Sequence, residues 1–243
     1  MVPIVSVACG LILVAILASR SWNSPAALDR FWAPVLDTSD PVLLSIGAVG
    51  APDSSMSLKD LHSAERVGYA DAEALADVTS FLASRNKAHR TRFQSLSKIE
   101  DLKDGPSVLI GAFNNTWTLR LTDQLRFRFL RDKNLSWIQD RDNPGSLQWS
   151  HVMTAPYTDL KEDYAIVSRV LDPTTGRLVV TAAGLAKFGT AAAGEFLTNP
   201  VYMQSINGMA PPGWDRKNIE IVIATSVVGL SSGPPHILAI HCW

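Results

Sequence analysis

The sequence predicts a three-layer α/β domain whose mixed, mostly parallel sheet contains one antiparallel hairpin and follows one transmembrane helix. Short apolar runs at 41–46, 107–110 and 178–183 each end in glycine, which is typical of buried strands that lead into loops and helices. The apolar run 164–171 is joined to the last of these by Asp-Pro-Thr-Thr-Gly, a turn-rich segment that favours a hairpin. Residues 2–18 form an uninterrupted apolar run.

Composition sets broad limits on the function. The chain has 243 residues, of which 47% are hydrophobic and 19% charged, enough for one α/β domain with a substantial core. The net charge of −1 gives no imbalance that would point to nucleic acid, so we expect no nucleic-acid partner. Of the two cysteines, Cys9 lies inside the apolar N-terminal run, so an internal disulfide with Cys242 is not expected.

The N-terminus predicts a single-pass protein of the cell membrane. We expect a membrane anchor over 1–20, in which residues 2–18 hold the protein in the membrane. A linker over 21–40 and an α/β domain over 41–243 follow. About 17 apolar residues is the lower limit for a span, so a cleaved signal and a buried helix are the alternatives. The run starts almost at the first Met, so an upstream signalling or DNA-binding domain can be missing from this chain.

The orientation of this span has one indicator in the sequence. Arg20 and Arg30 follow the apolar run, and no basic residue precedes it. The positive-inside rule then favours a cytoplasmic position for the domain.

The first half of the domain alternates strands and helices. After the strand at 41–47 we expect helices over 57–67 and from Asp71 onward, because apolar residues recur on one helical face. A strand at 91–96 and a helical turn at 99–104 lead to the strand at 107–110. The next helix begins at Asn114 or Asn115, and its predicted face consists of residues at four-residue spacing: Trp117, Leu121, Leu125 and Phe129.

The second half is dominated by strands. A short extended piece at 136–138 precedes the polar segment 139–162, which lacks a clean period and is either a lid or a plain insertion. After the hairpin, a helix over 191–198 ends at Asn199-Pro200. Strands at 219–228 and 236–242, linked by residues 229–235, complete the domain.

Polar residues gather where two of these strands meet their helices. In open α/β sheets, ligands bind beyond the carboxyl ends of the strands, and free N–H groups at helix N-termini favour anions. We therefore predict a crevice for a small polar or anionic ligand. The alternative is that the Asn and Thr side chains only cap helices. The candidate ligand-binding residues are Asn114, Asn115, Thr116, Thr118, Arg120, Gly189 and Thr190.

The sequence shows no catalytic, metal or cofactor motif. There is no phosphate-binding loop, no dinucleotide-binding glycine pattern and no zinc-type spacing, so we predict no cofactor and no metal ligand. The segment Gly229–Gly233 matches Gly-x-Ser-x-Gly, but Pro-Pro and a strand follow instead of the helix that a hydrolase elbow needs. His236 and His241, five apart on a strand, point to opposite faces.

Three segments resemble an uncharacterised bacterial family of α/β domains that stand behind one membrane helix. They are residues 109–122, 163–169 and 183–197, which include Gly-Ala-Phe-Asn-Asn-Thr-Trp-Thr and Ala-Gly-Leu-Ala-Lys-Phe-Gly-Thr. The resemblance covers roughly residues 31–243 and implies a domain outside the cytoplasm, against the arginine count. The resemblance implies no particular activity. A weaker resemblance is to periplasmic solute-binding domains, which place ligands on helix N-termini.

The leading functional hypothesis is a membrane-anchored ligand-binding or sensor domain, because no nucleophile–base pair or metal set is visible. An enzyme that acts on a small anionic substrate in the same crevice is the first alternative. A structural or interaction domain without a small ligand is the second.

Overall fold

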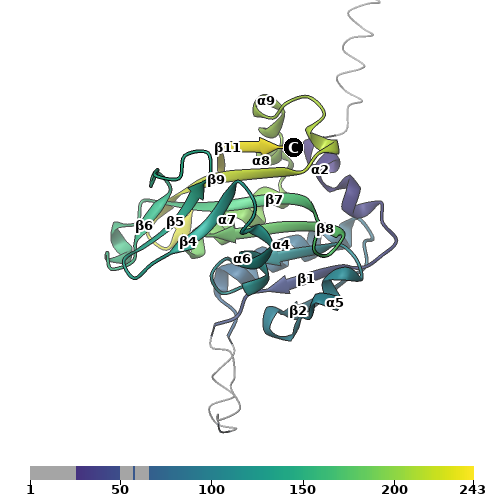
Figure 1. Cartoon of the computed structure of the whole chain (residues 1–243), viewed down its shortest axis with the longest axis horizontal. Coiled ribbons are helices and arrows are strands. Elements are labelled where there is room, and N and C mark those ends of the chain that lie inside the picture. Colours follow the sequence, from purple (N-terminus) through teal and green to yellow (C-terminus); the bar gives the residue numbers. More distant parts are fainter. Residues whose placement is uncertain (1–25, 50–56, 58–65) are drawn as a thin grey trace, which may run out of the picture.

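The computed structural model describes residues 26–49, 57 and 66–243, and an eight-stranded sheet forms its centre (Figure 1). The strands lie in the order β10-β9-β7-β8-β3-β1-β2, and β11 also pairs with β9. Their bounds are β1 (Val42–Ile46), β2 (His89–Phe93), β3 (Ser107–Ile110), β7 (Glu162–Asp172), β8 (Arg177–Gly184), β9 (Ile219–Val228), β10 (Ser231–Ser232) and β11 (His236–Cys242).

The prediction of a mostly parallel sheet is wrong. Only β1–β2, β1–β3 and β3–β8 pair in parallel, whereas β7–β8, β7–β9, β9–β10 and β9–β11 are antiparallel. The predicted hairpin reverses the strand direction at β7, and β9, β10 and β11 continue the alternation of direction. The segment between β9 and β11 is too short for the crossover that a parallel pair needs, so these two strands pair antiparallel.

Helices cover one face of this sheet and bury the main hydrophobic core. α4 (Tyr69–Ser84) packs along α7 (Lys187–Thr198), and α7 lies against β7, β8 and β9. α8 (Pro200–Met203) and α9 (Ile206–Met209) follow α7. The strands present alternate residues to these helices, such as Leu44, Ile110, Val167 and Ile221, all at most 1% exposed.

The stretch predicted as a linker contains helix α2 (Ala27–Leu36), which is part of this core. Phe31 and Trp32 are fully buried, and the indole N–H of Trp32 donates to the Leu197 carbonyl at 2.7 Å. The guanidinium of Arg169, 2% exposed, donates to carbonyls of Phe31 and of the 3₁₀ turn η3 (Trp214–Arg216). These bonds connect α2 to the centre of the sheet.

The other face carries two shorter helices and a second sheet. α5 (Ile99–Lys103) and α6 (Thr116–Thr122) cover the parallel half. Beside them lies a three-stranded antiparallel sheet, here called the flap, of β4 (Phe127–Arg131), β5 (Leu135–Asp140) and β6 (Ser150–Val152) (Figure 1). The 3₁₀ turns η1 (Gln94–Leu96) and η2 (Tyr157–Asp159) complete the described elements.

The central helix is shorter than predicted. It ends at Thr122, and Phe127 and Phe129 belong to strand β4, where they are buried while Arg128 between them is partly exposed. The alternation of aromatic and basic residues has a period of two, which is that of a strand with one buried face. The four-residue spacing that suggested one helix therefore combined residues of α6 with a residue of β4, on the two sides of a turn.

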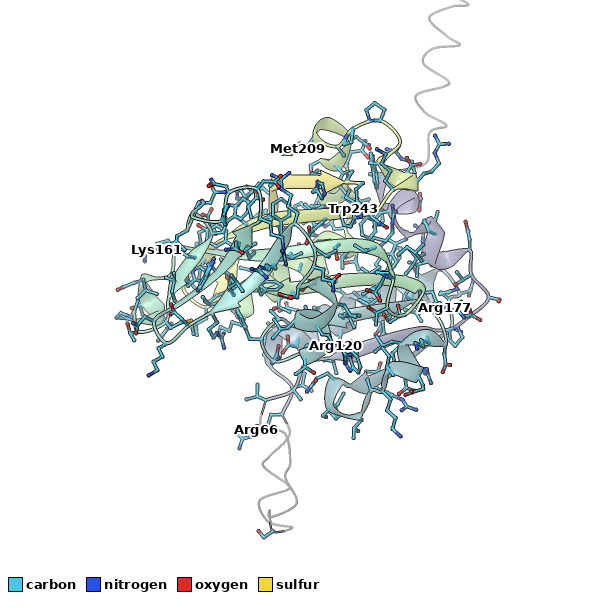
Figure 2. The ribbon with its side chains drawn as sticks, viewed as in Figure 1. Arg66, Arg120, Lys161, Arg177, Met209 and Trp243 are labelled. Carbon is cyan, nitrogen blue, oxygen red and sulfur yellow. The ribbon has the colours of Figure 1, made fainter. Side chains whose placement is uncertain are left out.

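The described part of the chain contains no helix long and apolar enough to cross a membrane, so the structure gives the predicted transmembrane helix no support. The residues on which that prediction fell, 2–18, lie outside the described ones, as does most of the helix predicted over 57–67. Arg66, where the described chain resumes, and Met209 of α9 lie at opposite ends of the view in Figure 2.

Candidate functional site

A crevice of about 540 Å³ lies at the carboxyl edge of β1, β3 and β8. These strands are parallel neighbours, so the turns after them meet at one edge. The start of α4 and the end of β4 close the other sides. The lining residues are Ala48, Val49, Gly68, Tyr69, Ala70, Asp71, Phe113, Asn114, Arg131, Gly184, Leu185, Ala186, Lys187 and Thr190.

Asn114 lies at the centre of this edge, held between two glycines. A Cβ on Gly47 or on Gly111 would lie within 2.7 Å of the Asn114 amide, so a side chain at either position would displace it. Gly111 also has a φ of +93°, which disfavours other residues. The Nδ2 of Asn114 donates to Oδ2 of Asp71 at 2.7 Å. The backbone of the strand exits thus positions one polar side chain in the crevice.

Asp71 is the acidic group of the crevice and is only 6% exposed. Burial raises the pKa of its carboxyl, and the hydrogen bonds from Asn114 and from the backbone of Gly68 oppose that rise. Asp71 stands in the first turn of α4, whose N-cap, Gly68, has no side chain to cap the helix. The N–H groups of Tyr69 and Ala70 have no acceptor among the described residues, and both residues line the crevice.

Two cations complete the lining. The guanidinium carbon of Arg131, at the end of β4, lies 3.7 Å from the centre of the Phe113 ring, and desolvation lowers the pKa of this arginine. Lys187 begins α7, and its ammonium lies over Phe188. In the described part of the chain, neither cation forms an ion pair with a carboxylate. The crevice therefore holds two exposed cations that no carboxylate of the described residues pairs with.

At the N-terminus of α7, an internal carboxylate takes two of the amide groups. Asp163 on β7, fully buried, accepts from the N–H groups of Gly189 at 2.7 Å and Ala186 at 3.1 Å. It also accepts from the Tyr164 N–H, and Nε2 of His151 lies 2.8 Å from its Oδ1. His151 is on β6, so this one carboxylate connects the flap, the main sheet and α7.

Of the seven predicted site residues, two line the crevice: Asn114 and Thr190. Thr190 is 3% exposed, and its hydroxyl accepts from the Gly184 N–H. Gly189 and Thr190 lie inside the first turns of α7, which begins at Lys187 and not at 191 as predicted. Gly189 instead gives β7 room, because a Cβ there would meet the Tyr164 carbonyl at 2.5 Å.

The remaining predicted residues do not line the crevice. Asn115 is fully buried, caps α6 through the N–H groups of Trp117 and Thr118, and donates to two strand carbonyls. The Thr116 hydroxyl donates to Gln94, and Thr118 is fully buried inside the helix packing. Arg120 lies over the ring of Trp117 and lines a different cavity.

The sequence analysis missed the charged residues of the crevice. Lys187 lies in the segment 183–197, three residues after the strand-ending Gly184, and that position could have indicated a cation at the sheet edge. Asp71 was assigned only as the start of a helix. Arg131 reaches the crevice because the flap folds back over the sheet, and nothing local in the sequence indicates that.

The described residues contain no group of three or more His, Cys, Asp or Glu side chains arranged for a metal ion. No known protein-family model matches the chain, and no curated protein is significantly similar to it.

Proposed function

We propose that this domain binds a small anionic ligand in the crevice between Arg131, Lys187 and the start of α4. The observation that carries the proposal is that two cations, Arg131 and Lys187, line one crevice without an ion pair among the described residues. The Arg131 side chain is exposed, its guanidinium lies over the Phe113 ring, and it has no carboxylate partner among the described residues. A guanidinium without an ion-pair partner can donate charge-assisted hydrogen bonds to a carboxylate or a phosphate, and the Phe113 ring fixes its position.

The rest of the lining defines the ligand further. Lys187 supplies the second positive charge, and the N-terminus of α4 adds a partial one. Asp71 and Asn114 on the opposite side offer acceptors and donors for hydroxyl or amino groups. A volume of about 540 Å³ suits a metabolite-sized compound. A carboxylate or phosphate that also carries hydroxyl or amino groups fits this arrangement best.

The test is a titration of the protein with inorganic phosphate, citrate, succinate and acidic and neutral amino acids, followed by thermal shift and calorimetry. We expect at least one of them to stabilise the domain. Arg131→Ala should weaken its binding by at least about tenfold, the loss of one charge-assisted contact. Lys133→Ala is the matched control, because Lys133 is an exposed cation of the turn after β4 that does not line the crevice.

The outcomes separate the three functional hypotheses. A ligand that binds and remains unchanged supports the binding domain, whereas conversion of a bound compound would make the crevice an active site. Asp71, with its raised pKa, would then be the first candidate for proton transfer. If no compound binds, or if Arg131→Ala and Lys133→Ala behave alike, the interaction-domain hypothesis takes first place.

A further inference from the structure

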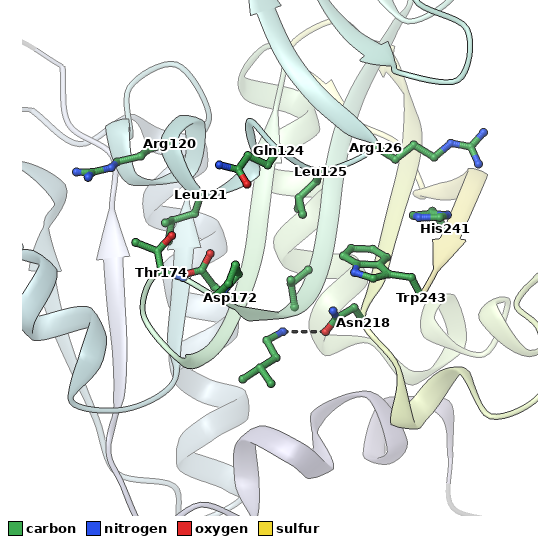
Figure 3. Close-up of a pocket in the computed structure, with 13 residues that line it drawn as sticks. Arg120, Leu121, Gln124, Leu125, Arg126, Asp172, Thr174, Asn218, His241 and Trp243 are labelled. Atoms are coloured by element: carbon green, nitrogen blue, oxygen red, sulfur yellow. Dashed lines mark hydrogen bonds between the residues drawn. The ribbon is translucent and has the colours of Figure 1, made fainter.

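A second cavity, of about 440 Å³, lies at the other edge of the main sheet, where β7 ends and β8 begins (Figure 3). Its walls come from the end of α6, the segment between α6 and β4, the end of β7 with the turn after it, and the end of β11 with the residue after it. None of its lining residues belongs to the crevice described above. It is therefore a separate site with its own chemistry.

One wall of this cavity is an aromatic surface. The indole of Trp243 stacks on the His241 ring, with the two centres 4.9 Å apart and an angle of 18° between the planes. His241 covers one face of the indole, and Trp243 is still 43% exposed, so its other face and edge are open to the cavity (Figure 3). Backbone hydrogen bonds in both directions with Asn218 hold Trp243 in place.

The polar groups around this surface are uncharged amides and one carboxylate. Asn218 uses its Oδ1 to accept the Leu171 N–H, and its Nδ2 has no partner among the described residues. Asp172, 6% exposed, uses Oδ1 to accept two turn N–H groups, and its Oδ2 likewise has none there. The side chain of Gln124 lies on the opposite wall (Figure 3).

The two arginines of the lining do not supply positive charge to the cavity. The guanidinium of Arg120 points away from it and lies over Trp117 (Figure 3). That of Arg126 also points away and is paired with Asp140 and Asp142 (Figure 3). With Asp172 as its inward-facing charge, the cavity does not suit an anion.

We propose that this cavity binds a neutral saccharide. A sugar ring has an apolar C–H face that packs on an indole, and its hydroxyl groups both donate and accept. Trp243 provides the surface, Asp172 accepts hydroxyl protons, and Asn218 and Gln124 provide amide groups to hydroxyl oxygens. Leu125 and Val170 form an apolar base beneath the ring.

The test uses the full chain and a panel of glucose, galactose, mannose, N-acetylglucosamine, cellobiose and maltose, followed by saturation-transfer NMR and calorimetry. At least one sugar should bind. Trp243→Ala should abolish the binding, and Trp243→Phe should retain most of it, because a phenyl ring preserves the stacking surface. Gln124→Ala should weaken binding by about tenfold or less without lowering the melting temperature, since its side chain is exposed and has no partner among the described residues.

Arg131→Ala is the control for independence, because it removes a cation of the other site and should leave sugar binding unchanged. Adenosine and uridine form the competing arm. Binding of a nucleoside without any sugar would overturn the saccharide assignment. So would the absence of binding across the sugar panel, or sugar binding that survives Trp243→Ala.

Discussion

At the scale of single residues, the least ordinary group is Glu220, a fully buried carboxyl at the start of strand β9. One oxygen accepts the Phe127 N–H at 3.0 Å, and the other has no partner among the described residues. Burial raises the pKa of Glu220 from 4.5 to about 8, while hydrogen bonds from the start of β4 and the charge of Arg126 oppose the rise and Asp140 adds to it. The native state therefore favours the protonated acid.

This shift predicts a pH dependence of stability. Below pH 4.5 the group is protonated in both the folded and the unfolded chain. Between pH 4.5 and about 8 the unfolded chain releases the proton that the folded chain keeps, so the contribution of Glu220 to stability falls as the pH rises. Glu220→Gln, which resembles the neutral acid, should remove this part of the slope, and each pKa unit of difference is worth about 1.4 kcal/mol.

Urea denaturation at pH 5, 6.5 and 8 measures the effect. The Gln variant should gain on the natural protein as the pH rises, and the gain should be largest at pH 8. Glu195→Gln is a control on the helical face, where the carboxyl is only partly buried and its pKa is raised less strongly. Parallel pH profiles for the natural protein and Glu220→Gln would contradict the protonated state.

Among single residues, the sequence indicated the helix cap but not the charged residues of the crevice. Asn115 was predicted as a helix cap or a ligand contact, and it is the cap of α6, because the local chain alone decides capping. Arg131 and Asp71 are brought together only by the tertiary fold, with about sixty residues between them in sequence. Local patterns contain no information on such a pair.

At the scale of elements, helix α7 begins without a cap of its own. Its N-cap position is Ala186, and the carboxylate of Asp163 on β7 substitutes for the missing side chain. The same group holds His151 of the flap. The start of α7 is therefore fixed by a distant strand, which explains why its first turn could not be located from the sequence around it.

Asp163→Ala should destabilise the domain severely, by roughly 3–5 kcal/mol, because buried N–H groups of Tyr164 and Gly189 would lose their acceptor. Asp159→Ala, an exposed carboxylate of η2, should change stability by about 0.5 kcal/mol or less. Chemical denaturation measures both. Amide exchange should report faster exchange at the start of α7 in a milder variant, Asp163→Asn, and unchanged protection there would argue against the capping role.

The strand order shows the same limit of local patterns. The sequence identified β1, β3, β7, β8, β9 and β11, and it also identified the hairpin. The antiparallel pairing of β9 and β11 could have been derived from the short link between them. The flap could not, because its strands are short and its position depends on Phe127, Phe129 and Trp149 packing against Ile166 and Val222 of the main sheet.

At the scale of the whole molecule, the domain begins before the first strand. Helix α2 buries Phe31, Trp32 and Val35 completely, and its carbonyls accept from the enclosed guanidinium of Arg169. Desolvation lowers the pKa of Arg169 to about 10, which shows how far this cation is removed from water. Without α2, its partners at Arg30 and Phe31 would be missing.

We therefore predict that residues 26–243 fold cooperatively and that residues 41–243 do not. Each large apolar side chain of α2 contributes roughly 1.5–3 kcal/mol by burial, so losing the helix removes an amount comparable to the 5–15 kcal/mol that holds a typical domain together.

Trp32→Ala in the longer chain should cost roughly 3–5 kcal/mol, because a cavity is added to the lost burial and the Leu197 carbonyl loses its donor. Leu36→Ala, at the half-buried end of the same helix, should cost clearly less. Circular dichroism and urea denaturation of the two chains and the two variants decide the matter. A cooperative transition of the 41–243 chain, with the stability of the longer one, would show that α2 is an appendage and that the domain begins at β1.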